Sequence, residues 1–336
     1  MRAELLSVRD LSVSFVTEGG VARVLDAINL SLAPGEIMGL VGESGCGKTT
    51  LARSILGALP ANASVDGGAM LFDGQDLLAF DRSVAGERVR GRAITFVPQD
   101  PFSSFNPLFT VGDQIMELLR WKSPDRRIGE RIYARSRRRA DHERTLALLR
   151  SVQLPDPERL LRKYPHELSG GQRQRVMIAM ALLPEPKLVI ADEPTTALDV
   201  TIQAQILKLL RQLATERGVS VLFATHDLGT AWEICDRVTV MYAGQELETA
   251  PIADFFRAPM VPYTRLLLDS LPSSDVALRG IPGDVPSLVA PPPGCRFHPR
   301  CPRVGDACRV EHPAAREPRV SHQVRCHHPH LEAVAA

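Results

Sequence analysis

The chain has 336 residues, enough for one large α/β domain and a smaller one, and its formal net charge of +1 argues against a global electrostatic attraction to nucleic acid. No apolar run approaches the roughly 20 residues that span a bilayer, and the N-terminus lacks the apolar core of a signal peptide, so we expect a chain of cytosolic origin. In a reducing compartment, the six cysteines favour free thiols or metal ligation over disulfides.

Strands and a glycine-rich loop are predicted in the N-terminal part. Apolar and polar residues alternate through Leu5–Phe15, which is typical of a half-buried strand, and Val24–Leu32 has the pattern of a second strand. Ile37–Val41 is a short apolar run suited to a buried strand. Thr50–Leu59 has helical periodicity, so the segment between Val41 and Thr50 joins a predicted strand to a predicted helix.

The middle of the chain mixes helical and strand patterns. Ile94–Val97 is a short strand, whereas residues 100 to about 170 are mostly helical and charged, and we interpret them as a helical subdomain inserted into an α/β core. Lys187–Ala191 and Val219–Ala224 are apolar runs typical of central parallel strands. An amphipathic helix between these strands is predicted to stop at Gly218. Its apolar face consists of Ile202, Ile206, Leu209, Leu210 and Leu213.

Two segments differ from the rest in composition. Ile281–Pro293 carries five prolines and little periodicity, which predicts a linker or an extended surface strap. Arg131–Arg139 is a local basic run, which we interpret as a solvated helical face in preference to a site for anions or lipids.

The string Gly42–Thr49, GESGCGKT, has the spacing of a phosphate-binding loop between a strand and a helix. Its glycines let the backbone wrap closely around a dense anion, which backbone N–H groups at a helix start bind well. Lys48 is expected to reach the terminal phosphates and Thr49 to hold Mg²⁺. The alternative, an ordinary glycine turn, does not explain this context. The residues that we assign to the nucleotide are Gly42, Ser44, Gly45, Cys46, Gly47, Lys48, Thr49 and Thr50.

Two carboxylates follow another buried strand. Asp192 comes directly after Lys187–Ala191, where it can hold Mg²⁺ directly or through water, and Glu193 is free to polarise an attacking water. A charge pair at a helix N-terminus is the alternative. Gln99 and His226 each close a strand-like run, and ligands bind at the carboxyl ends of parallel strands. We therefore expect Gln99 to reach the metal or the water and His226 to contact the γ-phosphate.

A third string, LSGGQ at Leu168–Gln172, lies between the loop and the Asp-Glu pair. With its strings in this order, the chain resembles the ATP-binding subunits of ABC transporters from about Leu5 to Ala250. The resemblance implies an α/β fold, the P-loop NTPase ABC cassette, with a mixed parallel-sheet core, an N-terminal antiparallel β-subdomain and an inserted helical subdomain. It also implies an ATPase that binds ATP between two protomers, because neither half-site alone surrounds the γ-phosphate.

The resemblance assigns roles to the third string. LSGGQ would open a helix and present its N-terminus to the γ-phosphate of ATP held by the other protomer. Ser169 and Gly171 would make that contact, with Gly170 and Gln172 beside them.

Other residues gain roles in the same way. Ala197-Leu198-Asp199 matches the loop that links the two sites across the dimer, so Asp199 is assigned to the site. Phe15 sits where an aromatic side chain usually stacks on adenine, and a buried strand residue is the competing interpretation. The helical insertion near Gln99, with the string PFSSFNPLFTVG, is the expected contact for a membrane partner.

Four of the six cysteines lie in the last 42 residues. Their spacing, C-x5-C-x6-C-x17-C, is neither a zinc ribbon nor a ferredoxin run, so spacing alone says only that four thiolates could share a metal. Six of the nine histidines lie there too, which makes mixed Cys/His zinc reasonable, whereas disulfides are disfavoured in a reducing cytosol. Cys46, in the loop, and Cys235, in a predicted helix, are interpreted as small residues. The four tail cysteines are Cys295, Cys301, Cys308 and Cys326.

The tail is similar to the C-terminal extension of dipeptide and oligopeptide importer ATPases, on the strings GCRFHPRCP at Gly294–Pro302 and HQVRC at His322–Cys326. Some members of that subfamily bind a [4Fe–4S] cluster through four such cysteines. The resemblance therefore implies a [4Fe–4S] cluster with a structural role, with Zn²⁺ as the alternative. We accordingly predict an ATPase domain over residues 1–258 and an extension over residues 259–336.

This subfamily resemblance implies the energy-coupling ATPase of a peptide importer. Its partners would be a second such ATPase or a second copy, two transmembrane permeases and an extracytoplasmic peptide-binding protein, but no nucleic acid, and it would lie peripherally on the cytoplasmic face of the inner membrane. Importers of glutathione, nickel, oligosaccharides or antimicrobial peptides are alternatives.

Two other classes of ABC protein compete with the importer. A soluble ABC protein acting on ribosomes or DNA usually has two cassettes or a long coiled coil, but this chain has one P-loop, one LSGGQ and no sustained heptads. A nucleotide-binding scaffold without turnover is disfavoured by the presence of Glu193 and His226.

Overall fold

The computed structural model describes residues 4–79, 88–127, 129–196, 199–271 and 280–331. The chain divides into two compact units, of which unit 1 comprises residues 1–78 and 224–336 and unit 2 comprises residues 79–223. Unit 1 therefore contains both ends of the chain, whereas unit 2 is one uninterrupted segment. The ATPase domain over residues 1–258 and the extension over residues 259–336 stay predictions.

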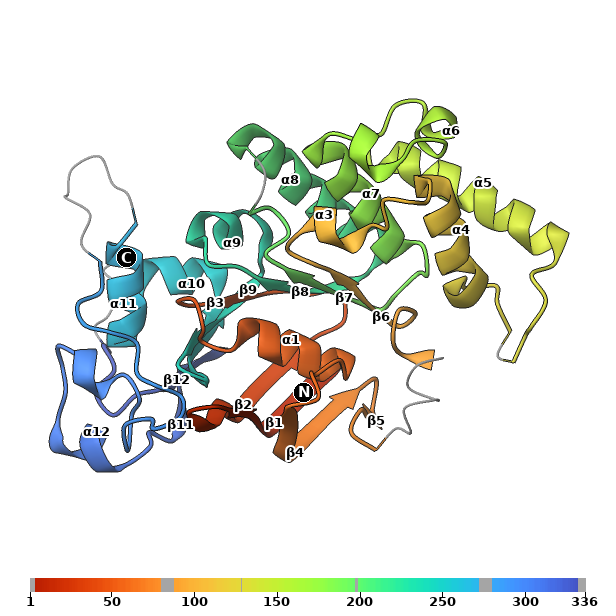
Figure 1. Ribbon diagram of the computed structural model, residues 1–336. Helices are drawn as coiled ribbons and strands as arrows, with labels where there is room; N and C mark the ends of the chain where they lie inside the picture. The colour runs from red at the N-terminus through yellow and green to blue at the C-terminus, as the bar shows by residue number, and fades with distance from the viewer. Residues whose placement is uncertain (1–3, 80–87, 128, 197–198, 272–279, 332–336) are drawn as a thin grey trace. The chain divides into compact units, whose positions relative to one another are not determined.

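Unit 1 begins with an antiparallel sheet in the strand order β2-β1-β4-β5 (Figure 1). Strand β1 pairs with β2 on one side and β4 on the other, and its apolar residues Val8, Leu11 and Val13 are buried. The two predicted N-terminal strands are confirmed, and this sheet matches the expected antiparallel β-subdomain. The bounds are Leu6–Thr17 (β1), Gly20–Leu32 (β2), Ala63–Phe72 (β4) and Gln75–Asp76 (β5).

Five further strands of unit 1 lie in the order β11-β12-β10-β9-β3 in a mixed sheet. Strand β3 runs parallel to β9, whereas β9, β10, β12 and β11 pair with one another in antiparallel fashion. All five residues of β3 are buried, as its apolar run predicts. The tail strands β11 and β12 thus continue this sheet. The bounds are Ile37–Val41 (β3), Arg237–Tyr242 (β9), Gln245–Pro251 (β10), Ala315–Arg319 (β11) and His322–Arg325 (β12).

The helices of unit 1 are short. Two predictions about them were wrong by one to three residues. The helix expected to reach Leu59 ends at Leu56, because Gly57 takes a left-handed backbone (φ 58°) and turns its N–H back to the carbonyls of the last turn. Cys235 lies just past its helix, in extended backbone. The bounds are Lys48–Leu56 (α1), Leu228–Ile234 (α9), Ile252–Arg257 (α10), Pro262–Asp269 (α11), His298–Arg300 (3₁₀ turn η2) and Asp306–Val310 (α12).

Unit 2 carries three strands in the order β8-β7-β6 and most of the helices. Strand β7 pairs in parallel with β6, and β7 and β8 are fully buried, as the apolar runs Lys187–Ala191 and Val219–Ala224 predict. The strands are Ile94–Val97 (β6), Leu188–Asp192 (β7) and Ser220–Ala224 (β8). The helices are Pro101–Ser104 (α3), Val111–Lys122 (α4), Arg135–Ser151 (α5), Pro157–Leu160 (α6), Pro165–Glu167 (3₁₀ turn η1), Gly170–Leu182 (α7) and Val200–Arg217 (α8).

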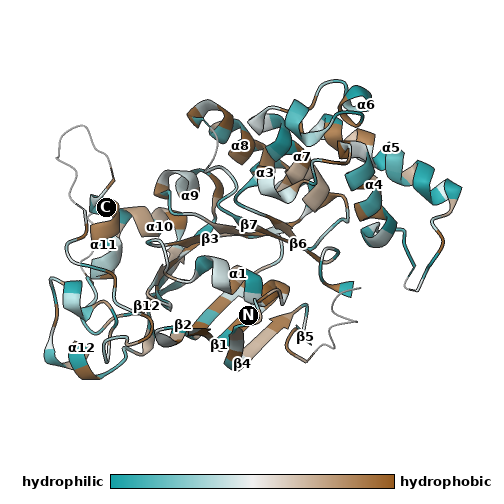
Figure 2. Cartoon of the chain, viewed as in Figure 1, coloured by the Kyte–Doolittle hydropathy of each residue, from teal (hydrophilic) through white to brown (hydrophobic). Residues whose placement is uncertain are grey.

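The predicted surface segments behave as expected in the described residues. The basic run Arg131–Arg139 is mostly exposed and leads into α5, which Figure 2 shows as a predominantly hydrophilic helix. Ile281–Pro293 contains neither helix nor strand, consistent with a linker or strap. Helix α8 ends where Gly218 adopts a left-handed backbone, as predicted. Among the described helices, none has both the length and the apolar character needed to cross a membrane.

Candidate nucleotide-binding and metal sites

The loop between β3 and α1 has a backbone that suits glycine. At Gly42 (φ 149°), a Cβ atom would lie 2.1 Å from the carbonyl oxygen of Met241, so any larger residue would collide with backbone. At Gly45 (φ 80°), a Cβ atom would meet nothing within 4 Å, and only the left-handed conformation calls for glycine. The loop is therefore closely packed at Gly42 and open at Gly45, where a ligand can approach the backbone.

The start of α1 is suited to an anion. Its N-cap residue Gly47 offers no side-chain cap, and the first turn holds no acidic residue, so its N–H groups are left for another partner. Lys48 is buried, and its Nζ donates hydrogen bonds to the carbonyl oxygens of Gly42 (2.7 Å) and Glu43 (3.3 Å). Thr49, by contrast, is exposed. A buried ammonium group, free helix amides and an exposed hydroxyl fit a magnesium-bound triphosphate.

Unit 2 brings three of the predicted residues together. Asp192 is the last residue of β7 and is buried, and Glu193 follows with a left-handed backbone (φ 49°). The side-chain amide Nε2 of Gln99 donates a hydrogen bond to Glu193 Oε2 at 3.0 Å, and the hydroxyl of Thr196 lies 3.3 Å from the same oxygen. A non-glycine residue in this conformation is strained, which is frequent at functional sites. Gln99 therefore orients the carboxylate that was predicted to polarise water.

The LSGGQ string opens α7, as the resemblance implied. Ser169 is the exposed N-cap; its Oγ accepts a hydrogen bond from the Gln172 N–H (3.3 Å), and Gln172 Oε1 accepts one from the Ser169 N–H (3.1 Å). A Cβ atom on Gly171 would lie 3.0 Å from Ile202 of α8, so a small residue is needed where the two helices approach. The first turn has no acidic residue, which leaves a second helix start suited to an anion.

The remaining predicted residues are placed separately. His226 is exposed two residues after the end of β8, and Phe15 is half-buried in β1 opposite Ala22 and Ala63. Asp199 accepts a hydrogen bond from the Ile202 N–H at 2.9 Å and caps α8. Ala197 and Leu198 lie outside the described residues.

The predicted site residues are divided between the two units. Unit 1 holds the loop, Phe15 and His226. Unit 2 holds Gln99, the Asp-Glu pair, the LSGGQ string and Asp199.

Sequence reasoning missed two sets of contacts. The guanidinium of Arg173, directly after LSGGQ, lies over the ring of Phe102 in α3, with its Cζ 3.4 Å from the ring centroid. Burial lowers the pKa of Arg173, against the attraction of Asp100. In unit 1, Glu43 of the loop is bonded by Arg300 and Tyr263 from the C-terminal region. The position of Arg173 directly after LSGGQ could have marked it as a candidate from the sequence. No local sequence pattern, by contrast, connects Glu43 with Tyr263 and Arg300, which lie more than 200 positions away.

The four tail cysteines line one small cavity of about 20 Å³. Burial, reinforced by the neighbouring thiols, raises the pKa of Cys295 to about 11 and that of Cys326 to about 12. The cavity has room for about one ion. Within the described part of the chain, however, no group of three or more His, Cys, Asp or Glu side chains is arranged as metal ligands. The prediction of a [4Fe–4S] cluster therefore gains no support from this arrangement.

Comparison with known proteins finds two family models that match different regions of this chain. The model of the family described as "ABC transporter" matches residues 25–196, and that described as "Oligopeptide/dipeptide transporter, C-terminal region" matches residues 247–308. A probable peptide ABC transporter ATP-binding protein of Sinorhizobium fredii is 47% identical over 327 residues, covering 96% of this chain and 94% of its own length. The dipeptide transport ATP-binding protein DppD of Bacillus subtilis is 44% identical over 329 residues, with the same coverage.

A solved structure shows the same fold. The dimeric ATP-binding cassette MJ0796, in a post-hydrolysis state bound to ADP and phosphate, superimposes with a TM-score of 0.62 at 27% identity. The match covers 74% of this chain and 98% of that cassette. With the phosphate-binding loop, the strand-end carboxylates and LSGGQ in place, this chain belongs to the ABC transporter family of ATP-binding subunits.

Proposed function

We propose that this protein hydrolyses ATP between two protomers and couples that reaction to the import of dipeptides or oligopeptides. The observation that carries the ATPase part is a pair of helix starts, at α1 in unit 1 and at α7 in unit 2, neither with an acidic residue in its first turn. Each can neutralise phosphate charge, and only the first carries a lysine and a glycine loop. One nucleotide would therefore use α1 of one protomer and α7 of its partner.

The other residues take complementary roles in this proposal. Lys48 neutralises the terminal phosphates, and Thr49, Gln99 and Asp192 hold Mg²⁺, which would offset the charge of the phosphates and orient them. Glu193 accepts a proton from the attacking water. His226 contacts the γ-phosphate. Phe15, half-buried at the start of the chain, stacks on adenine.

The shared site is tested at the helix start that faces the partner. Ser169→Arg places a long cationic side chain where the second protomer's γ-phosphate should sit, so we expect ATPase activity to fall about a hundredfold. Binding of ATP to the variant's own loop should persist. ATPase activity is measured by phosphate release, and dimer formation by light scattering with ATP. Normal turnover in Ser169→Arg would contradict the proposal.

The cargo is proposed from the relatives. The matches named for peptide and dipeptide transport cover nearly the whole chain, including the C-terminal region. We infer a peripheral position on the cytoplasmic face of the inner membrane, with two permeases, a second ATPase or second copy, and an extracytoplasmic binding protein. Deletion of the gene should abolish growth on defined peptides as the only amino-acid source. Unimpaired growth on every peptide tested, with loss of uptake of another nutrient, would reassign the cargo.

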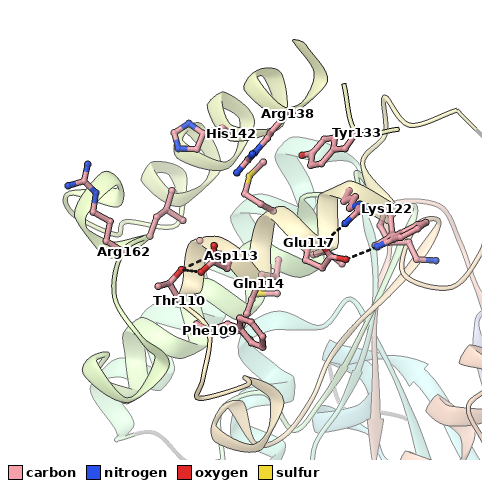
Figure 3. A pocket seen from close by; sticks show the side chains of 17 residues that line it. Phe109, Thr110, Asp113, Gln114, Glu117, Lys122, Tyr133, Arg138, His142 and Arg162 are labelled. Carbon is pink, nitrogen blue, oxygen red and sulfur yellow. Dashed lines mark hydrogen bonds and ion pairs between the residues drawn. The ribbon is translucent and has the colours of Figure 1, made fainter. Parts of the chain in front are cut away.

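The contact with a permease is proposed at a cavity of about 1430 Å³ in unit 2, between α4 and α5 (Figure 3). Its lining combines apolar Phe109, Met116 and Trp121 with basic Arg138 and Arg162. This volume exceeds the usual small-molecule pocket of roughly 300–1,000 Å³ and suits an amphipathic segment of a partner.

Trp121→Ala tests this contact, because it removes a large exposed apolar side chain from the cavity. We expect it to reduce co-purification with the permeases. Trp232→Ala is the matched control, since Trp232 is similarly exposed (49% against 46% for Trp121) but lies on α9 in unit 1. Equal permease binding by the two variants would refute the cavity as the docking site.

We propose further that the four tail cysteines hold a metal, either a [4Fe–4S] cluster or Zn²⁺. Their convergence on one cavity supports a soft metal, since thiolate ligands suit both. The cavity of about 20 Å³ has room for about one ion, so Zn²⁺ matches its size better than a [4Fe–4S] cluster does.

Metal content distinguishes the two. Anaerobically purified protein should contain either iron and sulfide with a broad absorbance near roughly 400 nm, or one zinc per chain. Cys301→Ser should lose the metal, whereas Cys235→Ser, a buried cysteine away from the cavity, should keep it. Metal-free wild-type protein would reject both assignments.

A further inference from the structure

We infer that Arg300 and Tyr263, both from the C-terminal region, are positioning residues for the phosphate-binding loop and act through Glu43. This inference rests on the proposed role of Gly42–Thr49 in binding ATP. All three residues belong to unit 1. The C-terminal region would then set nucleotide affinity, beyond any metal that its cysteines bind.

Arg300 binds the carboxylate of Glu43 through both terminal nitrogens of its guanidinium. Its Nη1 lies 2.8 Å from Glu43 Oε2 and its Nη2 lies 3.2 Å from Oε1, a bidentate pair. The remaining donor groups also have partners, since Nε donates to the Pro282 carbonyl oxygen (2.9 Å) and Nη1 contacts the Tyr242 hydroxyl (3.2 Å). The orientation of Arg300 is therefore fixed by the proline-rich segment on one side and the loop on the other.

Tyr263 holds the backbone of the same loop residue. The Glu43 N–H donates a hydrogen bond to Tyr263 Oη at 3.1 Å. Tyr263 is fully buried, and its ring packs against Tyr242 (4.7 Å between centroids) and Phe297 (5.1 Å). Because this N–H is committed to Tyr263, the backbone of the loop is fixed at Glu43, and the Glu43 carbonyl oxygen in turn accepts a hydrogen bond from the Cys46 N–H (3.3 Å).

The positive charge of Arg300 also has an electrostatic role at the loop, beyond its hydrogen bonds. Glu43 places a carboxylate within the loop that is proposed to surround a triphosphate, and an uncompensated carboxylate there would repel the ligand. Arg300 has a side chain only 4% exposed, so its charge is screened less than that of a surface arginine. Burial alone would lower the pKa of Arg300, but hydrogen bonds to Glu43 and Tyr242 outweigh it, and the net direction is upward. The guanidinium therefore stays charged and cancels the carboxylate.

The test separates this electrostatic role from simple stabilisation. In the full-length protein, Arg300→Leu should weaken binding of a fluorescent Mg²⁺–ATP analogue about tenfold, and added salt should shrink that deficit. The double variant Glu43→Gln/Arg300→Leu should recover most of the affinity, because no unpaired carboxylate remains. Arg300→Lys, which keeps the charge but not the bidentate grip, should lose only about two- to threefold.

A matched control lies in the same region. Arg325 also forms a partly buried ion pair, with Glu246 at 2.7 Å, but its partner is in β10 and not in the loop. Arg325→Leu should lower the thermal midpoint by as much as Arg300→Leu while leaving nucleotide affinity unchanged. If the two variants lose affinity equally, or if the double variant binds no better than Arg300→Leu, the inference is overturned.

Lys48→Ala distinguishes this failure from failure of the proposed function. Loss of binding in Lys48→Ala together with unchanged binding in Arg300→Leu would overturn only the role of Arg300. Unchanged binding in Lys48→Ala would remove the loop itself from the nucleotide site. Far-ultraviolet circular dichroism of each variant confirms that a loss of affinity does not come from unfolding.

Discussion

At the scale of single residues, the arrangement around Glu193 is the most informative. Its carboxylate is held by Gln99, and its backbone is kept in a left-handed conformation that costs on the order of 1–3 kcal/mol at a non-glycine residue. A strained residue whose side chain is oriented by a neighbouring amide is held in one position. In our proposal, the Glu193 carboxylate in this position accepts the proton of the attacking water.

Glu193→Gln tests this role directly. The amide keeps the shape of the side chain but cannot accept the proton, so we expect turnover to fall about 10²- to 10⁴-fold while ATP binding persists and a nucleotide-loaded dimer accumulates. Phosphate release and light scattering measure the two effects. Glu185→Gln is the control, because Glu185 is another left-handed glutamate of unit 2 and should be dispensable for turnover. A fully active Glu193→Gln protein would disprove the assignment.

At the scale of elements, a helix cap and a functional assignment coincide at Asp199. Its carboxylate accepts the Ile202 N–H and begins α8, and the resemblance also places it in the loop that links the two sites. These roles can be separated, because asparagine caps a helix about as well as aspartate does.

Asp199→Ala should destabilise the protein by about 1 kcal/mol through loss of the cap, whereas Asp199→Asn should leave stability nearly unchanged. If Asp199 also serves the shared site, ATPase activity should fall in both variants. Thermal denaturation and phosphate release are compared for the same preparations. Full activity in Asp199→Asn would leave only the role of a helix cap.

The positions of the buried strands can be predicted from the sequence more readily than those of the strands in the C-terminal region. Strands β3 and β7 are continuous apolar runs next to a recognisable loop or carboxylate pair, so their positions follow from composition. Strands β11 and β12 read AREPR and HQVR, which lack apolar alternation, and their places depend on the pairing of β12 with β10 and of β11 with β12. The role of Gly42 can be predicted from the local sequence motif, whereas the hydrogen-bond partners of Glu43 depend on tertiary contacts that no local sequence pattern predicts.

At the scale of the whole molecule, the C-terminal region is built into unit 1. His322 of β12 and Glu248 of β10 are both fully buried, with His322 Nε2 2.7 Å from Glu248 Oε1. Glu248 Oε1 and Oε2 also accept hydrogen bonds from the backbone N–H groups of Met260 (2.7 Å) and Val261 (3.0 Å). One carboxylate thus joins the sheet, the start of α11 and the last strand.

His322→Leu should therefore be costly. It would leave Glu248 buried without its charged or polar side-chain partner, and we expect a loss of about 3 kcal/mol in the free energy of unfolding. His322→Gln can still donate a hydrogen bond and should lose less. The thermal midpoints of the two variants provide the measurement. Equal stability of His322→Leu and wild type would show that the pair contributes nothing.

The discontinuity of unit 1 has a consequence for biosynthesis. Unit 2 is a single stretch of chain and is complete once residue 223 has left the ribosome, whereas unit 1 needs β12, which ends at residue 325. Until then, the nascent polypeptide carries β10 as a bare strand edge, a template for pairing with other chains. Premature termination between the end of β10 and the start of β12 should consequently yield aggregation rather than a smaller working enzyme.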